Sequence, residues 1–317
     1  MRKRISLLLV PLVCLTGRSQ HLTFQFGTPF QRTDLDVRWS LTSNELPRIA
    51  WVYRLSPQYF SPVAVSKLAG LGGFTDKDIL RSNASEITFK KPDYAHFTVL
   101  ASLGLIEFSP SQPIYSATNL ATNVPSLSHL AGLTTNLLGE LGINVTDIEK
   151  QPDGSPNFHL SQPFTVYGNH GKFVTNIAFR AVSFRRAVDG ASVVGNGAGG
   201  DCYIQFGENN KPVKISLSWR NLERYKAYET ASQETITKWI RHGKAVQGRI
   251  RMDAEPIDWK EVKSITITSA KLCYYGGSGD NPSEWFIPFV ALWATVDRGH
   301  ATIDVEIDCP IIDEARK

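Results

Sequence analysis

The glycine-rich run from Gly195 to Gly200 comes closest to a chemical motif in this sequence, because it satisfies the pattern G-x-G-x-x-G. In a dinucleotide-binding fold, such a loop follows a strand and opens a helix, whose N-terminal N–H groups hold the pyrophosphate. The residues that follow here, Asp201 to Phe206, alternate like a strand and show no helical stripe. We therefore expect the loop to join two strands and to hold no nucleotide.

Hydrolytic chemistry has little local support. Ser278 lies among Gly276, Gly277 and Gly279, but a nucleophile elbow requires a different glycine spacing, and the sequence contains no H-E-x-x-H. The histidines are scattered, with no pair at metal-ligand spacing, at His21, His96, His129, His159, His170, His242 and His300. We expect no catalytic residue, no metal and no cofactor, and an enzyme with a dispersed site remains the less favoured alternative.

The composition is that of a globular protein with a substantial core. The chain has 317 residues, of which 42% are hydrophobic and 20% charged, and its formal net charge is +4. No dense Lys/Arg stripe provides a footprint for phosphates, so we expect no nucleic-acid partner. After the N-terminus, no apolar stretch is long enough for a transmembrane segment.

The N-terminus has the pattern of a secretory signal. Arg2, Lys3 and Arg4 precede the apolar run Ile5–Leu15, which is too short to span a bilayer. We predict a signal peptide over 1–20 and a secreted, periplasmic or cell-surface protein. A buried N-terminal strand is the alternative. Cys14 raises the question of a lipoprotein signal and a lipid anchor, although the residues before it lack the usual small side chain.

Three helices are expected, each followed by strands. They cover 61–72, 125–142 and 230–243, with Ser61 as an N-cap and a capping box that begins at Thr230. Short turns between the strands require antiparallel neighbours. We predict an α+β fold of repeated helix-plus-antiparallel-sheet units: an N-terminal unit over 21–120, a second over 121–225 and a third over 226–317.

The segment 178–219 is predicted to be a β-meander. Its residues alternate with period two, Asp189-Gly190 supplies the positive φ angles of a tight hairpin turn, and 207–210 forms a second turn. A single sheet made of consecutive strands follows from this pattern.

The last predicted sheet concentrates aromatic residues. A packed core and its rim is the simpler interpretation, because aromatic residues favour strands. An exposed contact surface is the functional one, since Tyr and Trp anchor interfaces. On that hypothesis the binding residues are Tyr274, Tyr275, Trp285 and Phe286. Cys273 and Cys309 lie in neighbouring predicted strands, so export would allow a disulfide between them, and separate buried thiols are the alternative.

The segment 186–219 resembles the fungalysin/thermolysin propeptide pattern. The residues that carry the likeness are Asp189-Gly190, 193–195, 203–207 and 213–219. The segment 230–309 is similar to a PepSY module, through 270–275 and 285–293. The resemblance implies cystatin/PepSY-like units that precede and inhibit a metallopeptidase and carry no catalytic residues. No peptidase domain follows in this sequence.

Three functions follow as hypotheses. The first is a secreted or envelope, non-catalytic module that binds a protein or peptide and restrains a peptidase, by adding a strand to a sheet edge. The second is a structural or assembly subunit of the cell surface, which implies a homo-oligomer. The third is the enzyme with a dispersed site.

Overall fold

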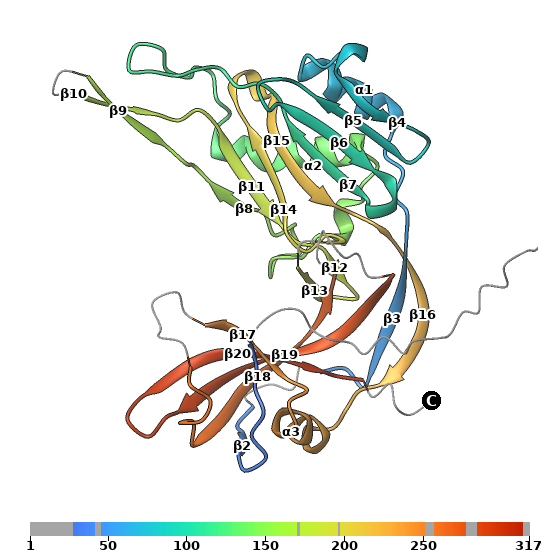
Figure 1. Cartoon of the computed structure of the whole chain (residues 1–317), viewed down its shortest axis with the longest axis vertical. Coiled ribbons are helices and arrows are strands. Elements are labelled where there is room, and N and C mark those ends of the chain that lie inside the picture. The colour runs from blue at the N-terminus through green and yellow to red at the C-terminus, as the bar shows by residue number, and fades with distance from the viewer. Residues whose placement is uncertain are drawn as a thin grey trace, which may run out of the picture.

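The chain forms two lobes, each around its own hydrophobic core (Figure 1). The computed structural model describes residues 28–41, 46–169, 172–195, 197–250, 257–276 and 284–312. The predicted signal peptide, Cys14, His170 and Ser278 lie outside these ranges. We name the lobes after their helices: the α1/α2 lobe, whose core comes from residues 60–219, and the α3 lobe, whose core comes from residues 30–55, 188–198 and 236–312.

The α1/α2 lobe is built on one antiparallel sheet of eight strands. In spatial order these are β4 (Ile79–Ser82), β5 (Glu86–Lys90), β6 (His96–Leu100), β7 (Leu105–Ser109), β15 (Pro212–Ser218), β14 (Cys202–Phe206), β11 (Arg180–Phe184) and β8 (His159–Ser161). The central β7–β15 pair joins a group of strands from the first half of the lobe to a group from its second half.

Helices α1 (Pro62–Leu71) and α2 (Leu127–Glu140) cover one face of this sheet. The N-cap prediction for Ser61 is confirmed, since its hydroxyl accepts a hydrogen bond from the N–H of Ala64 at 3.4 Å. The strand register places apolar side chains opposite one another in a row across six strands, namely Phe89, Phe97, Phe108, Ile215, Ile204 and Val182. This row packs with the helices in the core, and the intervening residues point to the opposite face.

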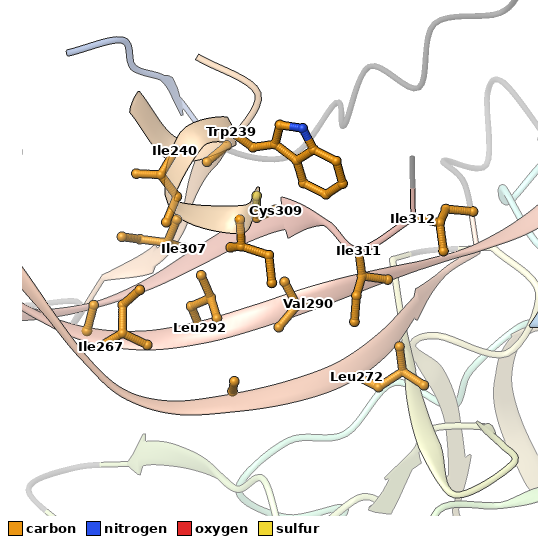
Figure 2. Packing of buried hydrophobic residues seen from close by; sticks show 14 of the residues in the cluster. Trp239, Ile240, Ile267, Leu272, Val290, Leu292, Ile307, Cys309, Ile311 and Ile312 are labelled. Atoms are coloured by element: carbon orange, nitrogen blue, oxygen red, sulfur yellow. The ribbon is translucent and has the colours of Figure 1, made fainter. Parts of the chain in front are cut away.

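Within the described ranges, the α3 lobe contains ten strands. They are β1 (Thr28–Pro29), β2 (Asp36–Trp39), β3 (Ile49–Ser56), β12 (Ala187–Val188), β13 (Ala191–Val194), β16 (Asn221–Glu229), β17 (Val246–Ile250), β18 (Ser264–Tyr275), β19 (Trp285–Asp297) and β20 (Thr302–Pro310). Helix α3 (Gln233–Arg241) lies over one face, and Figure 2 shows Ile240 directed toward Ile307 of β20, with Trp239 beside it in the same core.

The chain crosses between the lobes in three places. Strand β3 leads into α1, strand β15 runs on into β16, and the β12–β13 hairpin leaves the α1/α2 lobe between β11 and β14 (Figure 1). Strands β3 and β16 pair side by side as an antiparallel ribbon. At the third crossing, the buried guanidinium of Arg186 donates to the carbonyl of Arg220 at 2.6 Å and stacks on the Trp219 ring. The crossings tie the lobes together at separate points.

The predicted fold class is wrong, because the protein is β-rich and built on large sheets rather than on repeated helix-plus-sheet units. Segments assigned to different units share sheets: β7 pairs with β15, and β3 with β16. Two pairs are also parallel, β2–β18 and β13–β18, which short turns did not predict. Each joins strands that are distant in sequence, so the turn argument did not apply to them.

Several local expectations are also corrected. The meander over 178–219 divides, since β11, β14 and β15 stay in the α1/α2 lobe while β12 and β13 join the other sheet. The Asp189-Gly190 turn is confirmed, with φ of 49° and 81°. Helix α3 begins later than expected, because Ser232 rather than Thr230 is its N-cap and accepts a bond from Thr235 N–H.

A separate hairpin extends from the α1/α2 lobe. Its strands β9 (Thr165–Asn169) and β10 (Lys172–Asn176) pair with each other and form their own two-stranded sheet. Figure 1 shows it reaching well beyond the eight-stranded sheet. At its base, the side-chain oxygen of Asn176 accepts a hydrogen bond from Ala121 N–H at 2.8 Å. In the described ranges, no helix has the length and apolar character needed to span a membrane.

Candidate functional site

The four aromatic residues predicted to bind a partner do not form one surface. Tyr274 and Phe286 are 1% and 0% exposed, and their rings stack with centroids 5.6 Å apart. The Tyr53 ring meets Tyr274 edge-on, also at 5.6 Å. Both residues belong to the core of the α3 lobe, which leaves them no area for a partner. The packed-core interpretation fits these two positions.

Tyr275 and Trp285 are half-buried at the ends of their strands. The ring of Trp285 packs on that of Tyr225 from β16, with centroids 4.7 Å apart. Trp285 therefore helps to attach the β3–β16 ribbon to β19, where it pairs with Arg54. A structural role accounts for its position.

The β12–β13 turn is joined to the β3–β16 ribbon by hydrogen bonds to Asp189. The Asp189 carboxylate accepts hydrogen bonds from the hydroxyl of Tyr53 and from Arg224, the latter at 2.8 Å. Burial, followed by the bond to Asp189, raises the pKa of Tyr53 to about 12. The phenol stays protonated and donates to the carboxylate, so these three residues hold the β12–β13 turn against the ribbon.

Cys273 and Cys309 do not form the disulfide that export would allow, and both are buried free thiols. Strands β18 and β20 each pair with β19 rather than with each other, which separates them by about 10 Å, beyond the reach of a disulfide. The side chains also point to opposite faces, since Cys309 packs in the main core and Cys273 in a small cluster with Phe289 and Ala291. Burial raises the pKa of the Cys273 thiol to about 12.

The glycine loop joins strands β13 and β14, and no helix follows Gly200. A Cβ atom added at Gly200 would lie 1.9 Å from the carbonyl oxygen of Gly195, so close backbone approach explains this glycine. Asn196 lies outside the described residues. Within the described ranges, no set of three or more His, Cys, Asp or Glu side chains is grouped as a metal site would require.

A pocket of about 400 Å³ lies on the polar face of the eight-stranded sheet. Sequence analysis did not single it out. Strand register places His159, Ser183 and Tyr203 opposite one another across β8, β11 and β14. Asn157, Arg185 and Asp201 lie just beyond the ends of these three strands and also line the pocket, and backbone hydrogen bonds place Glu149 between Arg185 and Asn157. The alternation of polar residues at these positions was the available sequence signal, but only strand pairing shows that they meet.

Charge is balanced around this pocket. Arg185 forms an ion pair with Asp201, with Nη2 and Oδ1 3.0 Å apart. Glu149 also lines the pocket, and its carboxylate accepts a hydrogen bond from the Ser192 hydroxyl at 2.7 Å. The Lys271 ammonium lies 3.5 Å from that carboxylate. Because Ser192 and Lys271 belong to the α3 lobe, the pocket lies where the two lobes meet.

The β9–β10 hairpin exposes an apolar face. Phe173 is 77% exposed, Phe164 66% and Val166 48%. Gly168 lies opposite Phe173 and adds no side chain, so the Phe173 ring has only a backbone neighbour across the pair. Isolated two-stranded hairpins are marginally stable in water, and exposed apolar patches commonly mark contact sites. The hairpin and the pocket are therefore the two candidate sites.

No protein-family model matches the chain, and no curated protein matches it either. Among solved structures, the chain is similar to an uncharacterized protein from Eubacterium rectale. The sequences are 10% identical, the match covers 86% of this chain and 85% of the other, and the TM-score is 0.40. A likeness at this level carries no argument about function.

Proposed function

We propose that the protein is a non-catalytic binding protein of the cell envelope, which holds a partner polypeptide through the β9–β10 hairpin. The observation that carries the proposal is the exposed face formed by Phe164, Val166 and Phe173 on a hairpin that pairs with no other described strand. The proposed contact surface is therefore the hairpin and not the aromatic residues of β18 and β19, which the sequence pattern suggested.

The mode of binding is addition of a strand to the hairpin. The outer edges of β9 and β10 make no pair with any other strand in the part of the chain that the structure describes. An added strand takes up backbone hydrogen bonds at such an edge, and its alternate side chains cover the apolar face. A third strand also stabilises the hairpin, because three strands with an apolar face are far more stable than two.

The apolar face of the hairpin defines the partner further. A partner segment with alternating apolar residues complements the exposed side chains of Phe164, Val166 and Phe173. The resemblance to peptidase propeptides makes a peptidase the first class of partner to test, with this protein as its restraint.

The test is site-specific photo-crosslinking in the cells that produce the protein. A photoreactive phenylalanine analogue replaces Phe173, and the matched control carries it at Tyr59, which is 67% exposed outside the hairpin. We expect position 173, and not position 59, to cross-link a second polypeptide. A Phe164→Ser/Phe173→Ser variant should lose the complex, while Tyr59→Ser keeps it.

Each other outcome has a definite meaning. Cross-links between two copies of this chain would favour the assembly subunit and overturn the role as a restraint on another protein. Equal cross-linking at both positions, or at neither, would remove the hairpin as the contact surface.

A further inference from the structure

We infer that the pocket between β8, β11 and β14 binds a neutral, hydroxyl-rich ligand, namely a carbohydrate. The inference does not depend on the hairpin, because the two sites share no residue. Its basis is one row of hydrogen-bonding side chains across the sheet, His159, Ser183 and Tyr203, together with the polar side chains of Asn157, Arg185 and Asp201 just beyond the strand ends.

The size and the chemistry of the lining indicate the ligand class. A volume of about 400 Å³ is within the range of small-molecule sites. The lining combines acceptors, such as Asp201 and Glu149, with donors, such as Arg185 and Asn157. A sugar hydroxyl both donates and accepts, so one ring can bond to neighbouring groups of both kinds.

Charge argues against an ionic ligand. The carboxylate of Asp201 already bonds the Arg185 guanidinium at 3.0 Å, and that of Glu149 already bonds Ser192 and lies near Lys271. A cationic or anionic ligand would have to compete with these pairs for its counter-charge. A neutral ligand can bond to the remaining donors and acceptors of Asp201 and Arg185 while the ion pair stays intact, and hydrogen bonds to charged groups are the stronger ones.

Tyr203 supplies the flat apolar surface. It lies opposite Ser183, and its hydroxyl accepts a hydrogen bond from the Gln205 side chain at 2.6 Å, which fixes the ring orientation. The Lys214 ammonium lies over the ring, 5.9 Å from its centroid. An aromatic ring can cover the C–H face of a sugar while the polar side chains bond to its hydroxyls.

A sugar bound at this site would also connect the two lobes. Glu149 is held by Ser192 of β13 and Lys271 of β18, both in the α3 lobe, whereas the other lining side chains belong to the α1/α2 lobe. A ligand that bonds to Glu149 and to Arg185 thus connects groups held by both lobes. We expect binding to slow hydrogen exchange in β11 and also in β13.

The test uses ligand-observed NMR and calorimetry on the full chain with defined probes. The neutral probes are maltotriose, cellotriose and chitotriose, and the charged probes are L-lysine, L-glutamate and inorganic phosphate. We expect at least one neutral trisaccharide to bind with a millimolar or lower dissociation constant, and the charged probes to bind at least tenfold more weakly. Tyr203→Ala should weaken sugar binding at least tenfold, and Asp201→Asn should weaken it less.

Thr98→Val is the matched control. Thr98 stands on the same polar face of the sheet, in the row that reaches Tyr203, but three strands from it and outside the pocket. It should leave binding unchanged. Tyr203→Phe keeps the ring and should retain most of the affinity, which separates loss of the ring from failure to fold. The inference is overturned if no neutral probe binds, if a charged probe binds more tightly, or if Thr98→Val and Tyr203→Ala weaken binding equally.

Discussion

Arg186 and Arg224 make similar contacts at different depths, and Arg186 also donates a hydrogen bond to the Arg220 carbonyl. Arg186 and Arg224 each bond an aspartate, Asp147 at 3.2 Å and Asp189 at 2.8 Å respectively, and each lies over a tryptophan ring, at 4.8 Å and 5.1 Å. Their side chains differ in exposure, which is 6% for Arg186 and 56% for Arg224. Burial lowers the pKa of Arg186.

We expect Arg186→Ala to reduce the free energy of unfolding by about 3–5 kcal/mol. The change removes a charge-assisted bond to the Arg220 carbonyl, of about 1.5–3 kcal/mol, and leaves that carbonyl without this donor. It also removes a desolvated cation–π contact with Trp219, of about 2 kcal/mol, and leaves a cavity. Asp147 is half-exposed, so water solvates its carboxylate afterwards.

Arg224→Ala should cost much less than Arg186→Ala, because the Arg224–Asp189 pair is exposed to solvent. Arg186→Met separates volume from charge, because methionine fills most of the cavity and removes the bonds, and its cost should fall between the other two. Urea unfolding followed by circular dichroism gives the free energies, and hydrogen exchange in β11 and β14 locates the loss. Equal costs for the two alanine variants would refute the reasoning that burial sets the strength of these pairs.

Two further predictions concern glycines and thiols. Gly104→Ala should lower the melting temperature strongly, because Gly104 has φ of +56° and an added Cβ would lie 2.2 Å from the Trp219 carbonyl oxygen. In the control Gly132→Ala, in α2, the added Cβ meets no atom within 4 Å, so the melting temperature should rise slightly. Thermal unfolding of both variants checks these expectations. Burial raises the pKa of Cys202 and Cys273 from 9.0 to about 12, so their contribution to stability is complete below pH 9 and is lost as the pH rises toward 12. Urea unfolding across this range should show the decline, and a Cys202→Ala/Cys273→Ala variant should show a smaller one.

Local features of the fold could be predicted from the sequence. The α1 helix follows from the Ser61 cap, the Pro62 that succeeds it and the apolar side chains on one face. The turn at Asp189-Gly190 follows from its two residues alone. In each case the determining interactions lie within a few residues of one another, which is the range that sequence patterns describe.

Partnership between distant strands could not be predicted in this way. Alternation with period two indicates which side chains share a face of a strand, but it does not identify the strand with which that strand pairs. The pattern alone therefore predicts one sheet for Val193 and Tyr203, although β13 pairs with β18 and β14 with β15. The pocket was missed for the same reason, because Ser183 meets His159 and Tyr203 only through strand register.

The three crossings between the lobes constrain the order in which the newly made chain can fold. Strands β1, β2 and β3 lie at the start of the described chain, yet their partners β16, β17 and β18 are synthesised some two hundred residues later. The α1/α2 lobe has all its strands once β15 is made, whereas the partners of β1, β2 and β3 have not yet been synthesised at that point. Such long-range pairing folds slowly and leaves strand edges open to aggregation. Truncation before β18 should therefore abolish the α3 lobe and leave the N-terminal strands exposed.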